Sequence, residues 1–289
     1  MPALPTLFLS HGAPTYALQP GVAGAQLAAL GRRLPRPAAV LVVSPHWMTR
    51  GLAITAAAQP GTLHDFGGFP PPLYRLQYPA PGDPARAAAI AAQLTAAGWP
   101  VALDGQRPRD HGVWVPLLHL LPAAEVPVLQ LSMPHDLGPD AAWRLGQALA
   151  PWADAGVLLI GSGSLTHNLY ELGPPDAPAA AHAQAFVDWV RAAVRAGDGD
   201  ALVHALQRAP HAARAHPTAE HFLPLLIAAG AGRPGAPAAV LPGGMRHGVL
   251  SMESYAFGWP AAGLVDEGAD EGADEPADPA AARAQQLPQ

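Results

Sequence analysis

The sequence contains no cysteine, few charged residues and no long uninterrupted apolar run. Without cysteine, the chain has no disulfide, no thiolate nucleophile and no zinc or iron–sulfur site built on thiolates. No segment approaches the roughly 18 consecutive apolar residues of a membrane-spanning helix. The apolar run before His11 is also shorter than that of a signal peptide. We therefore expect a soluble, cytoplasmic protein that has no membrane partner.

Charge is scarce, because only 13% of the 289 residues are Asp, Glu, Lys or Arg, and the formal net charge is −6. Such a chain lacks the basic surface that binds nucleic acid, so no nucleic-acid partner is expected. Much of the acidity lies between Val265 and the end of the sequence, in a stretch of Asp, Glu, Gly, Ala and Pro. That stretch has too few large apolar residues for a core, which predicts a disordered, solvating tail.

Three short apolar runs each lead to a histidine. His11 follows "TLFLS", His46 ends "AAVLVVSPH", and residues 157–160 lead through a Gly/Ser turn to His167. Runs of this length, bounded by Gly, Pro and Ser, are typical of strands that are buried on both faces of a parallel sheet. Ligand sites of open α/β sheets lie at the carboxyl ends of the strands, so the three histidines should gather at one edge.

Helical patterns separate these runs. The expected helices are 21–34, 83–98, 139–156 and a section at 179–207, and further strands are expected at 126–133 and 248–258. Asp83 as N-cap and Gly98 at the C-terminal end delimit the second of these helices. The length suits one large core. The alternation predicts a single three-layer α/β domain with a mixed, mainly parallel central sheet.

The 13 histidines divide into candidates for chemistry and incidental residues. The candidates are His11, His46, His111, His167 and His221. We expect His119 to be a satisfied core residue, and His216 to lie near the site without belonging to it. The expected surface histidines are His182, His204 and His211, while His135 and His247 lie in turns and have no assigned role.

His221 competes with its neighbour Glu220 for a place at a metal. Non-haem iron commonly takes two histidines and one carboxylate, so Glu220 would complete a triad with His11 and His46. Adjacent side chains usually point in different directions, and only one of the two should reach the ion. Pro224 fits the first turn of a helix, which puts His221 in the loop ahead of it. Spacing alone leaves both possibilities open.

Eight segments, taken in order, resemble the DOPA-dioxygenase-type branch of the LigB-like class III extradiol ring-cleaving dioxygenases. They are "LFLSHGAP", "VSPHWMTRG", "TLHDFGGFP", "LYRLQYPAPG", "DHGVWVPL", "SGSLTHNL", "HPTAEHFLPLL" and "SMESYAFG". The resemblance spans about residues 4–258 and implies a LigB-like catalytic domain at 1–262, followed by the tail at 263–289. One departure is Ser164, where the family often has Asn.

The resemblance also implies the roles of the histidines. Metal ligands would be His11, His46 and His221, which decides for His221 over Glu220. His167 would act as catalytic acid/base and, in zinc-occupied members, as a further ligand. His111 would lie in the substrate pocket. The partners implied are O₂ and a catechol, DOPA or a related 3,4-dihydroxyphenyl compound, which opens beside the diol to a muconic semialdehyde.

The chemistry explains why imidazoles suit this reaction. Triplet dioxygen reacts slowly with closed-shell rings, so ring cleavage needs a redox-active metal with open positions, and Fe(II) on three protein groups provides them. Zn(II) also binds imidazole and could occupy the site, but it has no redox chemistry. His167 is the expected base for a catechol proton, because imidazole titrates near neutrality, and His111 is expected to hydrogen-bond a substrate or oxygen atom.

Other roles and functions stay open at the level of the sequence. His64 and Asp65 either line the mouth of the pocket or are structural, and Arg50 either pairs with a substrate carboxylate or forms a surface salt bridge. A zinc-dependent hydrolase and a non-catalytic metal-binding relative are the alternative functions. The oligomeric state is not predicted.

Overall fold

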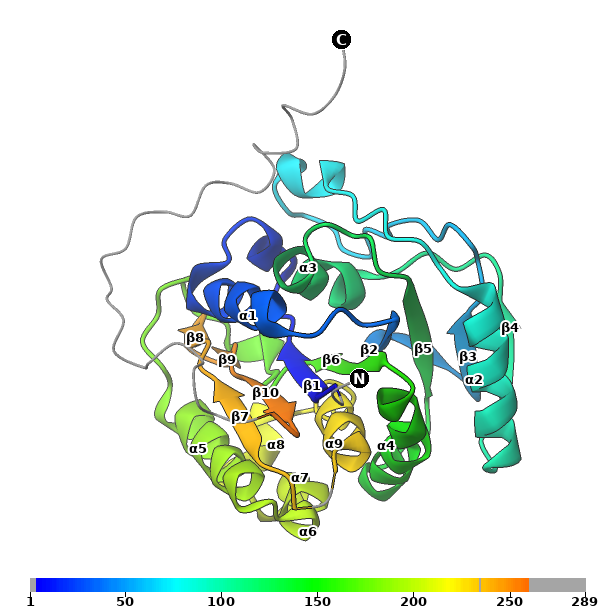
Figure 1. Ribbon diagram of the computed structural model, residues 1–289. Helices are drawn as coiled ribbons and strands as arrows, with labels where there is room; N and C mark the ends of the chain where they lie inside the picture. The colour runs from blue at the N-terminus through cyan, green and yellow to red at the C-terminus, as the bar shows by residue number, and fades with distance from the viewer. Residues whose placement is uncertain (1–3, 234, 260–289) are drawn as a thin grey trace.

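The central element of the protein is an eight-stranded sheet, seen in a computed structural model that describes residues 4–233 and 235–259 (Figure 1). The strand order is β4-β3-β5-β2-β6-β1-β10-β7. Its bounds are β1 Thr6–Ser10, β2 Ala39–Thr49, β3 Leu52–Thr55, β4 Val101–Asp104, β5 Val128–Pro134, β6 Val157–Gly163, β7 Ala238–Leu241 and β10 Ser254–Phe257. The expected tail at 263–289 lies outside the described residues.

The four central strands β5, β2, β6 and β1 are parallel to one another, and antiparallel pairs flank them. β10 pairs antiparallel with β1 and β7, while β3 pairs antiparallel with β5 and parallel with β4. The predicted mixed, mainly parallel sheet is therefore confirmed. A separate two-stranded sheet joins β8 (Met245–Arg246) to β9 (Leu250–Ser251).

Helices cover both faces of the sheet, which gives the three predicted layers. The longer helices are α1 Gly21–Arg33, α2 Pro84–Ala96, α3 His111–Leu120, α4 Pro139–Asp154, α5 Ala181–Ala196 and α9 Leu223–Ala231. Shorter ones are α6 Gly199–Val203, α7 Ala205–Arg208, α8 Ala212–Ala215, η1 Pro14–Ala17, η2 Pro71–Arg75 and η3 Leu169–Glu171. Figure 1 shows α1 and α3 together on one side of the sheet and α4, α5 and α9 on the other.

Alternation along the central strands fills both layers of core. Leu7 and Val40 pack with α1 and α3, whereas Phe8 and Leu41 pack with the helices on the opposite face. Strands with apolar side chains on both faces suit the centre of such a sheet. The predicted cap of α2 is also present, because the Asp83 carboxylate accepts a hydrogen bond from the backbone N–H of Arg86.

Two strand predictions are wrong in their extent. The second strand does not stop at His46 but continues to Thr49, with a register shift against β5 between Val43 and Met48. Pro45, which has no N–H to donate, lies within this irregularity. The closing strand expected over 248–258 is split into β9 and β10, and only β10 joins the main sheet.

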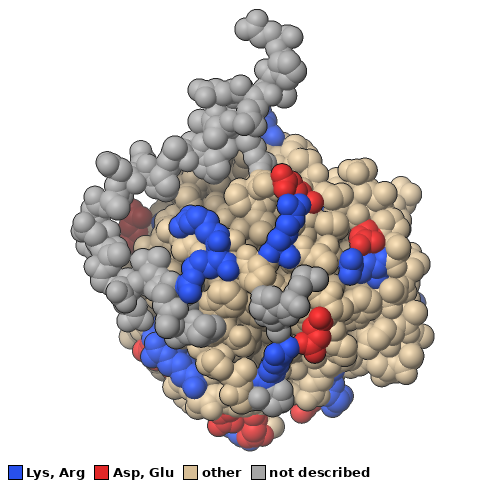
Figure 2. Space-filling model, in the orientation of Figure 1, with Lys and Arg blue, Asp and Glu red and all other residues tan. Residues whose placement is uncertain are grey.

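The surface carries little charge. The chain has no lysine, and Figure 2 shows few Arg side chains on the face seen in Figure 1, several of which lie against acidic side chains. Surface ion pairs such as Arg36–Glu125, at 3.3 Å, contribute little to stability. Within the described ranges, no helix is both long and apolar enough to cross a membrane.

Candidate metal centre and active-site cavity

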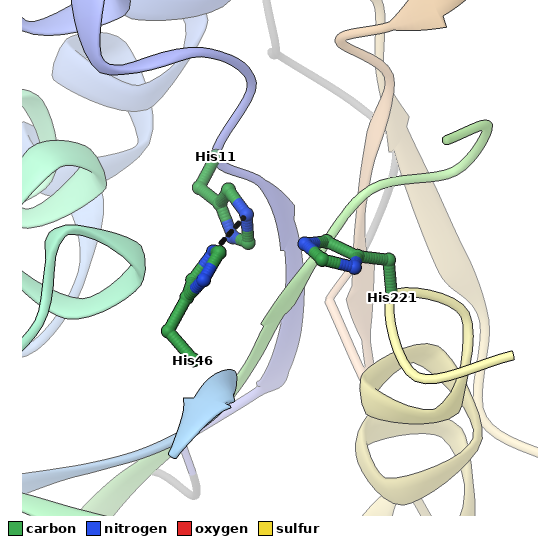
Figure 3. Close-up of side chains that lie close together, drawn as sticks. All are labelled: His11, His46 and His221. Carbon is green, nitrogen blue, oxygen red and sulfur yellow. Dashed lines mark hydrogen bonds between the residues drawn. The ribbon is translucent and has the colours of Figure 1, made fainter. Parts of the chain in front are cut away.

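Three histidines from distant parts of the chain converge at the carboxyl edge of the sheet (Figure 3). His11 follows β1, His46 lies near the end of β2, and His221 precedes α9. One nitrogen from each imidazole lies within 4.8 Å of the others. Figure 3 shows the ring of His221 pointing from the start of α9 toward the other two.

Backbone hydrogen bonds hold these residues on the end of β6. The N–H of His11 donates to the carbonyl of Gly163 at 2.9 Å, and the N–H of Ser164 donates to the carbonyl of His221 at 3.0 Å. A Cβ on Gly163 would lie only 2.3 Å from that same carbonyl oxygen of His221. The close approach of the His221 loop therefore requires glycine at this position.

Hydrogen bonds at the remote ring nitrogens assign the tautomer of two of these histidines. The Ser162 hydroxyl donates to the carbonyl of Gly112, so its oxygen accepts from Nδ1–H of His11 at 3.0 Å. Nδ1–H of His221 donates to the Glu220 carboxylate at 3.2 Å. In both rings Nε2 is then left with a free lone pair, which is the form that binds a metal.

The spacing of the nitrogens fits a shared ion. Nε2 of His11 and Nε2 of His46 are 3.2 Å apart. Two nitrogens bound to one ion at about 2.1 Å lie ~3.0 Å apart when they subtend about 90°, and ~3.4 Å apart at a tetrahedral angle. The observed separation falls between these values. A cation can use both lone pairs at once, which makes this donor set suitable for a divalent transition metal.

Burial keeps the three rings neutral. It lowers the pKa of His46 to about 2, together with the electrostatic effect of His111 and His221. Burial is also the main cause that lowers the pKa of His11 and of His221. Metal ligands must be deprotonated, so these imidazoles do not need to lose a proton before binding an ion at neutral pH.

Glu220 lies behind His221 and does not converge with the other two imidazoles. Its carboxylate accepts hydrogen bonds from Nδ1–H of His221 and, at 2.8 Å, from the hydroxyl of Thr218. These contacts lower the pKa of Glu220 to about 2, the bond from His221 most strongly. A carboxylate in this position orients a histidine ligand and increases its basicity. The geometry therefore favours His221 over Glu220 as a metal ligand.

His167 stacks on His221 rather than joining the same group. The two rings are nearly parallel, with 7° between their planes and 3.5 Å between their centroids. A ligand lone pair lies in the plane of its ring, so an ion in the plane of His221 lies outside the plane of His167. Burial, followed by the effect of His221, lowers the pKa of His167 to about 3. The geometry therefore fits an acid/base group better than a fourth ligand.

Asp65 anchors His111 beside the centre. Its Oδ1 accepts from the backbone N–H of His111 at 2.9 Å and from Nδ1–H of that ring at 3.0 Å. Its Oδ2 lies 3.9 Å from Nδ1 of His46, and the rings of His46 and His111 have centroids 4.0 Å apart. His64 does not face the centre, because its Nε2 contacts the carbonyl of Leu76 at 3.0 Å. Of His64 and Asp65, only Asp65 therefore contacts the histidines of the centre.

A cavity of about 540 Å³ opens in front of these residues, and all five candidate histidines line it. Its size is ordinary for a small-molecule site. The apolar part of its wall consists of Ala13, Pro14, Phe66, Phe69, Leu169, Leu172, Pro175, Leu250 and Met252. Five further lining residues, Thr15, Tyr16, Gln19, Arg246 and His247, add polar groups that the sequence motifs did not indicate.

The other histidines divide as follows. His119 is buried with Nε2 3.1 Å from the carbonyl of Tyr16, as expected for a satisfied core residue, and His216 is buried outside the lining of the cavity. The prediction for His182 was wrong, because it is 7% exposed where α5 packs near Glu171. His211 is exposed and His204 is half-exposed, whereas His135 is exposed away from the cavity.

Arg50 and Ser164, two residues of the motifs, differ in their position relative to the cavity. Arg50 is exposed and does not line the cavity, so it is not placed to meet a substrate there. Ser164, at the position where the family often has Asn, lines the cavity and donates its hydroxyl to the carbonyl of Thr166 at 2.7 Å.

Comparison with known proteins identifies the family of the chain. The family described as "Catalytic LigB subunit of aromatic ring-opening dioxygenase" matches residues 5–257. The chain therefore belongs to the LigB family and is an extradiol aromatic ring-opening dioxygenase, a metal-dependent class of enzyme. The resemblance inferred from the eight segments is confirmed.

Individual relatives match over nearly their whole length. The chain is 38% identical over 256 residues to the 4,5-DOPA dioxygenase extradiol of Beta vulgaris, which covers 87% of this chain and 96% of that protein. It is 39% identical over 262 residues to the protein of the same name from Escherichia coli (strain K12), and the match covers 88% of this chain and 95% of that protein. The crystal structure of an uncharacterized protein from Escherichia coli K12 has a TM-score of 0.72, is 33% identical and covers 88% of this chain and 100% of its own.

Proposed function

We propose that this dioxygenase opens the ring of a catechol, DOPA or a related 3,4-dihydroxyphenyl compound, with Fe(II) bound by His11, His46 and His221. The observation that carries the proposal is the convergence of three neutral imidazoles, 3.2 Å apart at their closest nitrogens, on the floor of a cavity that is lined mainly by apolar side chains. Relatives at 38% and 39% identity are called 4,5-DOPA dioxygenase extradiol, which supports this choice of substrate.

Three ligands leave room for reactants. A bound Fe(II) would supply the redox chemistry and the charge that favours ionised catechol oxygens. The flat apolar ring of a catechol suits the wall formed by Phe66, Leu169 and Met252. His111, whose Nδ1–H donates to Asp65, would hydrogen-bond a substrate or oxygen atom.

His167 is the proposed acid and base. Its pKa of about 3 keeps the ring neutral, so that a lone pair is available to take a catechol proton. The negative charge of the ionised substrate favours the imidazolium and raises this pKa toward neutrality. The protonated ring can then return the proton to an oxygen atom of the opened product. This cycle needs His167 unligated, which agrees with its stacked position on His221.

Ring cleavage is tested with a known metal in the protein and a controlled supply of O₂. The full chain is loaded anaerobically with Fe(II), and a 3,4-dihydroxyphenyl compound and O₂ are then added. We expect one O₂ consumed per catechol and a yellow ring-opened product, identified by mass spectrometry, and no turnover with Zn(II). Hydrolysis of an ester or amide with Zn(II), together with no O₂ uptake on any catechol, would contradict the proposal.

A further inference from the structure

We propose that Arg246 and Tyr16 form a subsite for an anionic group, so that the enzyme selects catechols whose side chain carries a carboxylate. The inference rests on the proposed function and adds the residues that recognise the part of the substrate away from the diol. Arg246 belongs to β8 and Tyr16 to η1, and both line the cavity that contains the histidines.

Arg246 presents an uncompensated charge to the cavity. It is the only Lys or Arg among the described residues that line it, and no Asp or Glu is among those lining residues. In the described ranges the guanidinium forms no ion pair. Its Nη2 donates to the carbonyl of Gln19 at 3.2 Å and would lie 3.1 Å from a Cβ on Gly21. The group is therefore held over the start of α1 while most of its five N–H donors remain available.

Tyr16 adds a second donor that has no partner. The side chain is only 5% exposed, and its buried hydroxyl makes no hydrogen bond within the part of the chain that the structure describes. Its ring packs on that of His119, with centroids 4.7 Å apart. Arg246 contacts the carbonyl of Gln19, three residues after Tyr16, and both side chains line the same cavity. Burial raises the pKa of Tyr16, and the charge of Arg246 opposes that rise.

These two groups match a carboxylate. Leaving a buried hydroxyl unpaired costs roughly 1–3 kcal/mol, so a ligand that accepts its hydrogen bond gains by removing that penalty. A carboxylate oxygen accepts from both O–H and guanidinium N–H, and such charge-assisted bonds are stronger than neutral ones. Since the subsite and the histidines share one cavity of about 540 Å³, a single small molecule can engage both.

The residues that line the cavity also predict that the substrate needs no ammonium group. Because no carboxylate lines the described cavity wall, an ammonium group on the side chain has no ionic partner there. We therefore expect 3-(3,4-dihydroxyphenyl)propionate, which lacks an amino group, to react about as well as DOPA. Dopamine, which carries an ammonium and no carboxylate, should react poorly.

The experiment compares kcat/KM for 3-(3,4-dihydroxyphenyl)propionate with that for its neutral amide, using the Fe(II)-loaded full chain. We expect the wild-type chain to prefer the acid by roughly 10- to 100-fold. Arg246→Met should reduce the preference to less than about 3-fold, mainly through a higher KM for the acid. Arg246→Lys should restore part of the preference, and Tyr16→Phe should reduce it several-fold.

Arg50→Met is the matched control, because Arg50 is exposed and does not line the cavity. This variant should keep the wild-type preference. A ratio of kcat/KM for acid to amide near 1 in the wild-type chain would overturn the subsite. So would a folded, metal-loaded Arg246→Met variant that keeps the wild-type ratio. In either case, ring cleavage of both compounds would still uphold the proposed function. A more than tenfold preference for DOPA over the propionate would also overturn it. If Arg246→Met does not fold, the wild-type ratio of kcat/KM for the acid to that for the amide tests the subsite.

Discussion

The ring of His167 lies parallel to the ring of His221, with 3.5 Å between centroids. This relationship separates two histidines that the sequence places in one group of candidates. A ring stacked on a ligand cannot aim its lone pair at the same point as that ligand, yet it stays within reach of a reactant bound beside the ion. The stacking supports the proposed division of roles, in which His221 binds the metal and His167 transfers the proton.

The first prediction follows from this division. His167→Ala should retain about one metal ion per chain and lose activity by roughly 10²–10⁴-fold, because it removes only the acid/base group. His46→Ala should lose the ion itself. Metal content by plasma emission spectrometry and O₂ uptake measure the two effects. His135→Ala, at an exposed position, is the control. Full activity in His167→Ala, or full metal content in His46→Ala, would show that the roles are assigned wrongly.

A second prediction concerns the carboxylate behind His221. Glu220→Gln removes the charge that orients the His221 ring and increases its basicity, and we expect the Kd for the metal to rise by roughly 10- to 100-fold. Glu125→Gln, at the surface pair with Arg36, should leave the Kd unchanged. Competition with a chromophoric chelator gives both values. Equal affinities in the two variants would mean that Glu220 does not support the ligand.

A third prediction concerns acid stability of the metal-free protein. Burial lowers the pKa of His216 to about 4 in the folded chain, whereas an unfolded histidine titrates near 6.5. Between these values the unfolded chain binds the proton and the folded chain does not, so the free energy of unfolding must fall as the pH drops from 6.5 to 4. His216 alone would contribute roughly 3 kcal/mol to this loss.

Urea unfolding of the metal-free chain at several pH values measures that slope. His216→Gln keeps an N–H donor for the carbonyl of Leu165 but has no titratable group, so its stability should depend less on pH. His135→Gln, exposed in the folded chain, should keep the wild-type slope. Identical slopes for His216→Gln and wild type would refute the assignment.

A fourth prediction uses the contact between β6 and the His221 loop. Gly163→Ala places a Cβ 2.3 Å from the carbonyl oxygen of His221, so the loop must move. We expect a loss of about 1–3 kcal/mol in unfolding free energy and a weaker metal affinity, since His221 moves with the loop. Gly105→Ala, where a Cβ meets nothing within 4 Å, should change neither quantity. Unchanged metal affinity in Gly163→Ala would show that this contact does not position His221 for metal binding.

The sequence predicted the fold class and the grouping of histidines because both depend on local patterns. Buried parallel strands have continuous apolar runs, and their carboxyl ends meet at one edge of the sheet. That reasoning brought His11 and His46 together without any structure. Spacing could not choose between Glu220 and His221, since the choice depends on how the loop before α9 packs against β6.

The errors have tertiary causes. His182 lies on a helix with polar neighbours in sequence, and only the packing of α5 buries it. Arg246 and Tyr16 are more than 200 positions apart, and the paired strands β8 and β9 bring the guanidinium to the start of α1. No local pattern signals such a pairing, although Tyr16 follows His11 closely enough to lie near the same edge of the sheet.

Anomalous diffraction from crystals grown anaerobically with Fe(II) tests the metal centre most directly. We expect a single strong peak at the iron absorption edge, within about 2.1 Å of one nitrogen each of His11, His46 and His221 and beyond bonding distance of His167. A peak bound by Glu220 in place of His221, or by fewer than three of these imidazoles, would contradict the assignment.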